Sequence, residues 1–334
     1  MDNLCHTLVG LALAQAGLKR KTPLATATLV VGANLPDVDV LAYAWGPVTA
    51  LGFRRGLTHG VLALAVWPFV LVGVMLAWDR FVRRRGDGGL LPAARGPLLV
   101  VSAIALLTHP FLDWLNVYGM RWLMPFSGWW SYGDTLFIVE PAIWIVLGAG
   151  IALSMRARPH RRTAAPEGAS PRAGRPARMA LALVAAYIVV MAGVSLSVRS
   201  AVMREVRGRG LEPGRVMVSP VPLSPLVREV VYTLPGVYQS GVTRLFGRAE
   251  WDPDAVSVLT DLPASHAAAA TATGRTYLSW ARFPVFTPGP YDGCPAGHVC
   301  LRDMRFWRLP WAEVAIPVGA PVSLAPSTPN RERP

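Results

Sequence analysis

Three histidines and a group of carboxylates lie in or beside the apolar segments of the first 198 residues. Ionisable groups are expensive in such surroundings. His109 and Asp113 are four residues apart, so a helix would place an imidazole and a carboxylate on one face, one turn apart. Such a pair could share a metal ion or a proton. The alternative interpretation is that His109 only forms a hydrogen bond with Asp113 inside a packed helix.

A second polar interruption is the segment 34–39 (NLPDVD), which brings Asp37 and Asp39 into an otherwise apolar run. Its proline and polar residues are expected to break a helix, and a broken element in a membrane must line protein or water. An ordinary polar turn at the interface is the alternative. His59 and His6, each taken singly, are more typical of interfacial or packing histidines than of ligands.

As a set, these residues predict a binding site for a divalent cation. Neutral imidazole and carboxylate groups bind zinc, and they also suit manganese or iron. Close carboxylates would repel one another without a cation, and two ions could activate a water between them. The predicted metal ligands are His6, Asp37, Asp39, His59, His109, Asp113 and Asp134. The predicted catalytic residues are Asp37, Arg54, Arg55 and Glu140, with the arginines at the rim to bind an anionic substrate.

The composition indicates a membrane protein with two parts. Of the 334 residues, 52% are hydrophobic and only 16% are charged, which is low in charge for a soluble domain. Long apolar blocks continue to about residue 198, after which apolar residues mix with Pro, Gly and charge. We therefore expect a membrane-embedded helical domain at 1–198 and a smaller domain at 199–334. Three cysteines exclude a disulfide-dense scaffold, and no P-loop, GxSxG or HExxH motif occurs.

Four apolar segments are long enough to cross a bilayer. The segments 60–78 and 179–198 carry no charge, whereas 97–119 and 135–155 contain the ionisable residues described above. The shorter run 7–18 could belong to a secretory signal, because Ala14-Gln-Ala16 resembles a cleavage site. A retained segment is favoured, since the basic cluster follows the run instead of preceding it.

Basic residues predict the orientation. The loops 19–21, 80–95 and 156–178 hold fifteen Lys and Arg, whereas 46–59 and 120–134 hold three. By the positive-inside rule the basic loops are cytoplasmic, which places the candidate ligands and the C-terminal domain outside the inner membrane. The Arg-rich stretches lack interleaved aromatic residues, so we expect contacts with anionic membrane lipids and no binding of nucleic acid.

The C-terminal part is predicted to be β-rich. The runs 229–234 and 237–246 flank Pro235-Gly236 as a hairpin, and 277–286 and 299–307 are expected to be further strands. Residues 326–334 have the composition of a disordered tail. Cys294 and Cys300 could bind a metal with His298, but an extracytoplasmic location favours a disulfide.

Five separated motifs occur in an order that resembles a bacterial family, the LexA-regulated, membrane-bound metal-dependent hydrolases. These are His6, then NLPDVD at 34–39, RRGLTHG at 54–60, HPFLD at 109–113, and GD at 133–134 with FIVE at 137–140. The segments LSWARF at 278–283 and DMRF at 303–306 resemble the C-terminal region of longer members. One departure is Arg55, where related sequences usually have histidine-arginine before the glycine.

The resemblance implies a helical fold similar to zinc-dependent phospholipase C and P1-type nucleases, which bind zinc through His and Asp. The implied ligands are His6, Asp37, Asp39, His59, His109 and Asp113, with Asp134 and Glu140 as further candidates.

The expected function is that of a multi-pass inner-membrane hydrolase. In this hypothesis, a metal-activated water attacks an ester or phosphoester, with a lipidic substrate favoured by a site in the outer leaflet. One alternative is an ion- or proton-coupled transporter, which would need polar residues continuing to the inner face; 60–78 and 179–198 offer none. Another is a non-catalytic membrane anchor that presents the C-terminal domain and uses the metal only structurally.

Overall fold

The computed structural model describes the chain except for residues 86–88, 158–170, 245–246, 308–311 and 319–334. The predicted disordered tail at 326–334 lies outside the described residues. The chain forms two compact units. The first unit comprises Met1–Tyr232 with Ser240–Asp252, and the second comprises Thr233–Gln239 with Pro253–Pro334.

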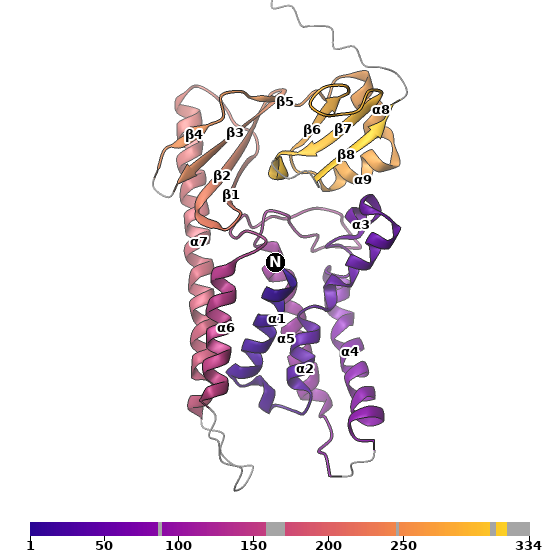
Figure 1. The fold of residues 1–334 in the computed structure, drawn as a ribbon, viewed down its shortest axis with the longest axis vertical. Coiled ribbons are helices and arrows are strands. Elements are labelled where there is room, and N and C mark those ends of the chain that lie inside the picture. Colours follow the sequence, from indigo (N-terminus) through magenta and orange to yellow (C-terminus); the bar gives the residue numbers. More distant parts are fainter. Residues whose placement is uncertain (86–88, 158–170, 245–246, 308–311, 319–334) are drawn as a thin grey trace, which may run out of the picture. The chain divides into compact units, whose positions relative to one another are not determined.

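The first unit is mainly helical, as the sequence predicts (Figure 1). Its α-helices are α1 (Asn3–Ala16), α2 (Ala25–Gly32), α3 (Pro47–Phe53), α4 (Val61–Trp78), α5 (Arg95–Trp114), α6 (Pro141–Arg156) and α7 (Arg175–Gly208). The tighter or wider turns are η1 (Leu18–Arg20), η2 (Leu35–Trp45), η3 (Asp79–Arg83) and η4 (Pro171–Gly174). The expected break at 34–39 is present, since α2 ends and the 3-10 helix η2 begins there.

In the described part of the chain, three helices are long and apolar enough to cross a membrane: Val61–Arg83, Arg95–Trp114 and Arg175–Gly208. The apolar helix α6 is shorter than the predicted segment 135–155, because it begins only at Pro141. Proline suits the first turn of a helix, where its missing N–H is not needed. Glu140 therefore lies just before this helix and not within it. The predicted domain boundary at 198/199 lies inside α7, which continues to Gly208.

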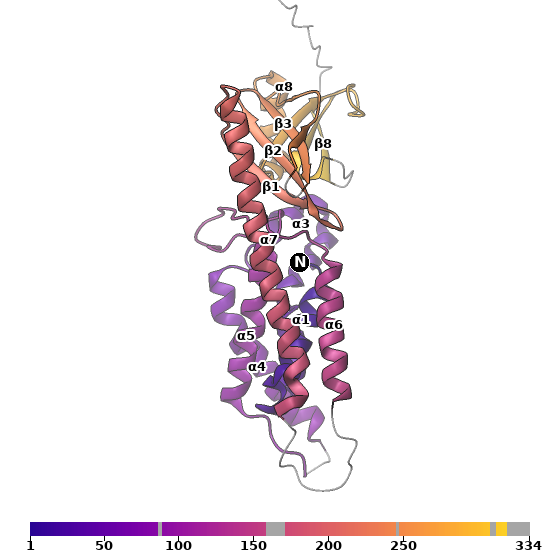
Figure 2. The same ribbon diagram turned by 90° about the vertical axis from the view of Figure 1, so that its left-hand side faces the viewer.

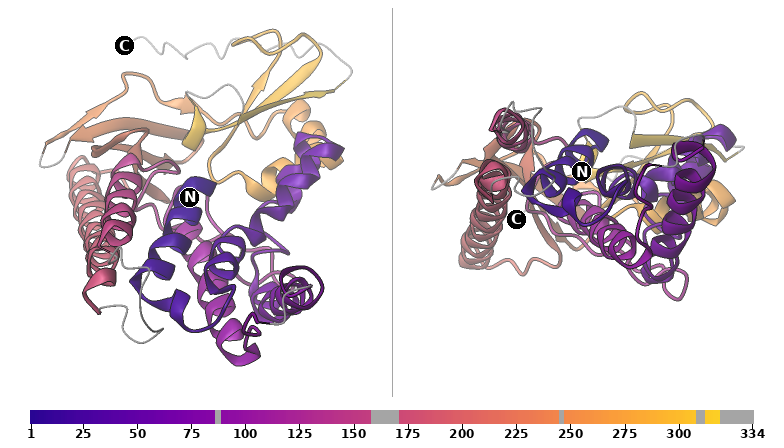
Figure 3. Two further views of the ribbon diagram at one scale, coloured as in Figure 1. Left: turned by 60° about the horizontal axis from the view of Figure 1, so that its bottom comes forward. Right: turned by 90° about the horizontal axis from the view of Figure 1, so that it is seen from below.

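The helices pack in a row. Contacts run from α6 and α7 through α1 and α2 to α5 and α4 (Figure 3). A core of apolar residues from α1, α5, α6 and α7 joins the row, including Val9, Leu112, Leu147 and Val184. Small residues allow close approach within it: a Cβ on Gly10 would lie 2.8 Å from the carbonyl oxygen of Leu29.

One end of the first unit collects the basic helix ends. Figure 2 shows the start of α7 and the end of α6 at the lower end of the helices. Hydrogen bonds join this end: Arg178 donates to the carbonyl of Ala16, and the amide of Ala177 donates to Ser154 Oγ. The amide of Ala94 similarly donates to Thr22 Oγ1 at 2.8 Å. The C-terminal end of α5, which carries His109 and Asp113, lies at the opposite end of the helices (Figure 1).

An antiparallel sheet follows α7. Its strands are β1 (Val216–Val221), β2 (Ser224–Leu234), β3 (Val237–Arg244) and β4 (Ala249–Trp251), in that order, with β5 (Val256–Ser257) paired to β3. The predicted hairpin is confirmed, and Gly236 provides the positive φ of 73° that the turn needs. The fully buried Arg228 of β2 donates to the carbonyls of Thr135 and Met191, which fastens β2 to the helices.

The second unit contains α8 (Pro263–Ala270), α9 (Ala272–Trp280), β6 (Pro284–Pro288), β7 (His298–Asp303), η5 (Met304–Phe306) and β8 (Glu313–Pro317). Strands β6, β7 and β8 form an antiparallel sheet. Cys294 and Cys300 form a disulfide, so the predicted disulfide is confirmed.

Two strand predictions were wrong in part. The segment 277–286 is helical to Trp280 and becomes a strand only at Pro284. Its aromatic residues suggested a strand, but the Thr271 side chain accepts a hydrogen bond from the Gly274 amide and caps a helix. Tyr277 and Trp280, three residues apart, then share its buried face. The segment 299–307 is a strand only to Asp303, and η5 begins at the next residue, Met304.

Candidate metal centre

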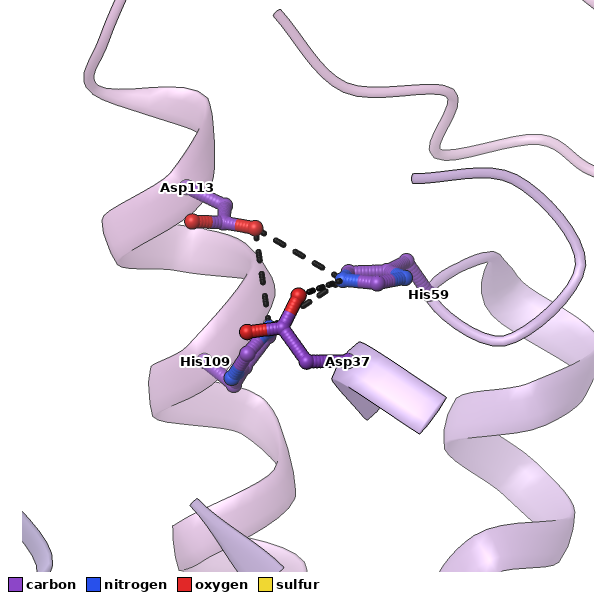
Figure 4. Close-up of side chains that lie close together, drawn as sticks. All are labelled: Asp37, His59, His109 and Asp113. Carbon is purple, nitrogen blue, oxygen red and sulfur yellow. Dashed lines mark hydrogen bonds and ion pairs between the residues drawn. The ribbon is translucent and has the colours of Figure 1, made fainter. Parts of the chain in front are cut away.

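Helix α5 supplies one side of a buried cluster of His and Asp residues. His109 and Asp113 are one turn apart on its buried face, as their spacing predicts, and they are 0% and 1% exposed. His109 Nε2 lies 3.5 Å from Asp113 Oδ2. Figure 4 shows both side chains pointing toward the same space as Asp37 and His59.

His59 reaches this space from the turn 54–60, which immediately precedes α4. The turn is held against the segment 119–124, because the amide of Val61 donates to the carbonyl of Trp122 at 2.8 Å. Gly60 is required there, since a Cβ would lie 2.4 Å from the carbonyl oxygen of Met124. Burial lowers the pKa of His59, which favours the neutral imidazole that a metal requires as a ligand.

Asp37 comes from the first turn of η2 and completes the group. Its Oδ1 lies 3.8 Å from His59 Nε2, and its Oδ2 lies 3.8 Å from His109 Nε2. Asn3 of α1 donates to Asp37 Oδ2 at 3.0 Å and fixes the orientation of the carboxylate. One ligand atom from each of Asp37, His59, His109 and Asp113 lies within 4.8 Å of the others.

The hydrogen bonds of the two central imidazoles show where their protons lie. His109 Nδ1 is 2.6 Å from the carbonyl oxygen of Ala33. A carbonyl can only accept, so Nδ1 carries the proton and Nε2 presents a lone pair. His59 Nδ1 lies beside Thr58 Oγ1 and Asp39 Oδ2, at 2.9 and 3.4 Å, which assigns its proton in the same way.

The two Nε2 lone pairs consequently face each other at 3.1 Å, next to two carboxylates. Asp113 Oδ2 is buried and accepts no hydrogen bond from the part of the chain that is described. Two imidazole nitrogens and two carboxylates that converge in this way suit a divalent cation. The backing of each imidazole by a carbonyl or carboxylate is also the usual outer shell of a metal site. The residues therefore fit a bound metal ion.

Two further predicted ligands lie directly beside the group. His6 Nε2 is 3.3 Å from Asp113 Oδ1, and its ring stacks on that of His109 with centroids 3.8 Å apart. Asp39 stands behind His59 and accepts hydrogen bonds from the Arg54 guanidinium at 2.7 Å and from the Arg55 amide at 2.8 Å. Asp39 thus contacts His59 from behind, and His6 contacts Asp113 and the His109 ring without joining the four grouped residues.

The two predicted arginines, Arg54 and Arg55, differ in their exposure. The Arg54 side chain is 20% exposed, and its guanidinium pairs with Asp39 and Asp37. Arg55 is instead buried: it donates to the Asp113 and Gly119 carbonyls and lies 3.1 Å from Asp113 Oδ2. Its positive φ of 50° turns the chain inward, which sequence spacing could not show.

Asp134 and Glu140 stand outside the four grouped residues. The buried Asp134 receives a hydrogen bond on its carbonyl from Ser195 of α7. The Glu140 carboxylate accepts from the Phe137 amide and from the Tyr187 hydroxyl. The Asp134 backbone and the Glu140 carboxylate thus tie the segment before α6 to α7.

Sequence reasoning missed the residues that position this centre. Asn116 accepts from Arg55 Nη1 at 2.9 Å and from the Tyr118 amide. Arg121 donates to the carbonyls of Gly52 and Arg54, and its guanidinium lies over the Trp130 ring. Asn3 offered a signal that was not used, because it is three residues before His6 and so shares its helix face.

Comparison with known proteins agrees with this membrane part. The profile of the YdjM inner membrane protein family matches residues 1–197. The chain therefore belongs to this family of bacterial inner membrane proteins.

Among the relatives is the Bacillus subtilis (strain 168) protein described as the uncharacterized protein YfhP. It is 24% identical over 164 residues, which cover 46% of this chain and 46% of that protein. The chain thus matches about half the length of this curated relative. No solved structure matches the chain.

Proposed function

We propose that this protein is a membrane-bound hydrolase that uses a divalent metal ion. The main support is the convergence of one ligand atom each from Asp37, His59, His109 and Asp113 within 4.8 Å. The Nδ1 atom of each imidazole also forms a hydrogen bond on the side away from this group. Mixed imidazole and carboxylate ligands favour zinc, with manganese or iron as alternatives. The sequence resemblance to LexA-regulated membrane hydrolases and to the phospholipase C and P1 nuclease group supports the same choice.

When bound, the ion would lower the pKa of a water and supply hydroxide near neutral pH. In the proposed reaction, hydroxide adds to a carbonyl carbon or phosphorus, the ester bond breaks, and the leaving oxygen takes the remaining proton. Arg54 can bind an anionic oxygen of the substrate, because its guanidinium remains partly exposed. Arg55 holds the Asp113 carboxylate in place, and Asp39 holds the His59 ring.

We place the protein in the inner membrane as a multi-pass protein with the metal centre on the extracytoplasmic side. The family supports the inner membrane, and three apolar helices support insertion. The basic ends of the helices lie opposite the centre within the first unit, so the positive-inside rule assigns them to the cytoplasm. The C-terminal sheets would follow α7 on the extracytoplasmic side.

Hydrolysis of bis-p-nitrophenyl phosphate and p-nitrophenyl butyrate by purified full-length protein tests the activity. Chelator-treated protein should be inactive and should regain activity with Zn²⁺, Mn²⁺ or Fe²⁺. His109→Ala should lower kcat/KM by more than about 100-fold, beyond the usual cost of losing an outer-shell partner. Ile145→Trp, on the exposed face of α6, is the matched control. Metal-loaded protein that cleaves neither ester, or an active His109→Ala variant, would contradict the proposal.

Thiol labelling tests the orientation. Phe126 and Leu91 are 79% and 75% exposed and lie at opposite ends of the first unit. A membrane-impermeant maleimide should label Phe126→Cys in intact spheroplasts and Leu91→Cys only after permeabilisation. The native Cys5 is buried, which keeps the background low. Equal labelling of both variants in intact spheroplasts would contradict the assigned orientation.

A further inference from the structure

An apolar pocket opens beside the metal centre. It has a volume of about 730 Å³ and is formed by η2, α3 and the following turn, with Ala42, Trp45 and Phe53 among its lining residues. This volume is within the roughly 300–1,000 Å³ typical of small-molecule sites. None of the residues assigned above to metal binding forms its apolar part, so the pocket needs its own explanation.

The pocket is continuous with the shell of the metal centre. Two of its lining residues, Asp39 and Thr58, are the residues that contact the His59 ring from behind. Asp39 also accepts a hydrogen bond from Arg54 at 2.7 Å. One end of a molecule that fills the pocket is therefore separated from His59 by only one side chain, Asp39 or Thr58. The same end lies next to the partly exposed Arg54 guanidinium.

The surroundings of the pocket indicate a lipid as the occupant. The turn that closes it leads directly into α4, a helix apolar enough to span the membrane. Exposed apolar side chains continue from the pocket onto this helix, namely Leu41, Trp45, Phe53, Leu57, Val66 and Phe69. Leu41 and Trp45 are 63% and 73% exposed, and a group of exposed apolar side chains of this kind is typical of a membrane or ligand contact. The hydrocarbon that must surround α4 is that neighbour.

We propose that the pocket binds one acyl chain of a membrane phospholipid and directs its anionic head group toward Arg54 and the metal centre. A hydrocarbon chain matches the apolar lining, and a phosphate matches the guanidinium. The inference rests on the proposed function only for the reaction: it names phospholipids as the substrate class of that hydrolase. Binding of the chain depends on the pocket alone.

Photolabelling of full-length protein tests this binding. The probe is a phosphatidylglycerol with a diazirine in one acyl chain, at low mole fraction in nanodiscs of phosphatidylethanolamine. After irradiation, the tryptic peptide 22–54 should carry label that excess unlabelled phosphatidylglycerol displaces. Label on the outward face of α4 should not be displaced, since bulk lipid contacts it.

Two variants fill the pocket. Ala42→Trp occupies its interior, whereas Thr49→Trp narrows it from an exposed position and should not affect folding. Each should lower the displaceable label on 22–54 by about tenfold, because the added ring takes the space of the chain. Ile145→Trp should leave the label unchanged. Undiminished label in Thr49→Trp, or label on 22–54 that unlabelled lipid does not displace, would overturn the proposal.

Asp113→Asn separates this inference from the proposed function. It should lose bound metal and hydrolysis while keeping the displaceable label. Displaceable label in a wild-type protein that binds no metal would retain the lipid pocket and reject the hydrolase. Metal-dependent hydrolysis without displaceable label would retain the hydrolase and reject the lipid pocket.

Discussion

Two buried carboxylates, one in each unit, are paired with an arginine but differ in how they are satisfied. In the second unit, Asp303 accepts hydrogen bonds from the amides of Arg282 and Arg305 and from the Arg305 guanidinium. In the first unit, Asp113 Oδ2 faces the Arg55 Nε at 3.1 Å and two imidazole nitrogens at 3.5 and 3.6 Å. It accepts no hydrogen bond from the residues that are described.

The difference indicates that the Asp303–Arg305 pair only stabilises the fold, whereas Asp113 belongs to a candidate ligand site. Asp303 and Arg305 lie two residues apart and form an ion pair, and the guanidinium also lies against the stacked Trp280 and Phe306 rings. Asp113 is surrounded by groups from separate elements that leave one oxygen and two lone pairs directed at a common point. Arg55 pairs with the Asp113 carboxylate, but the convergence of further buried acids and imidazoles on one point is typical of a ligand site.

Replacing the two aspartates one at a time gives the largest expected effect. Asp113→Asn should abolish stoichiometric metal binding, because an amide is a poor ligand for zinc. Asp303→Asn should leave the metal content unchanged. Elemental analysis of detergent-purified protein measures both, and equal metal contents in the two variants would remove the distinction between the two carboxylates.

Removing one partner of the second pair should mainly affect stability. Arg305→Met keeps the bulk of the side chain but leaves Asp303 as an uncompensated buried charge. The expected loss is about 3–5 kcal/mol in the opening free energy of β6 and β7. Amide hydrogen exchange on the full-length protein measures it, with helix α5 as the internal control. Unchanged exchange in β6 and β7 would show that the pair contributes nothing to the fold.

Arg55 should affect metal binding by less than a ligand does. It contacts the Asp113 carboxylate and two carbonyls, and lysine cannot reproduce these contacts. Arg55→Lys should weaken metal affinity by about 10–100-fold, as for other outer-shell partners. The neighbouring Arg54→Lys should raise KM for an anionic substrate and leave metal affinity nearly unchanged. Competition with a zinc chelator measures the metal affinity of both variants. Weaker metal binding in Arg54→Lys than in Arg55→Lys would contradict the roles assigned to the two arginines.

The smallest effect concerns pH and the second unit. Burial raises the pKa of Tyr277 above its ordinary value of 10.0, and its hydroxyl donates to the carbonyl of Ala312. The unfolded chain then releases this proton at lower pH than the folded chain does. The stabilisation from Tyr277 is therefore complete below about pH 10 and falls as pH rises further. Tyr277→Phe should show a shallower loss of thermal stability between pH 9 and 11; identical slopes would contradict the assignment.

The sequence alone predicted those members of the buried group whose evidence is local. The spacing of His109 and Asp113 fixed a shared helix face, and the polar break before η2 identified Asp37. Arg55 and Glu140 were placed less well, since the direction of each side chain depends on distant contacts with Asn116 and Tyr187. Composition also misled at Tyr277, where a helix cap outweighs the strand preference of aromatic residues.

Helix α7 runs without interruption through 34 residues, or about 51 Å, while the hydrocarbon of a bilayer is about 30 Å thick. Its far end carries Glu205, which accepts a hydrogen bond from the Trp251 indole of β4. The helix therefore sets both the height and the rotational phase of the first sheet. One residue inserted near its middle would turn everything beyond it by about 100°, while seven residues would raise it by two turns and nearly restore its direction.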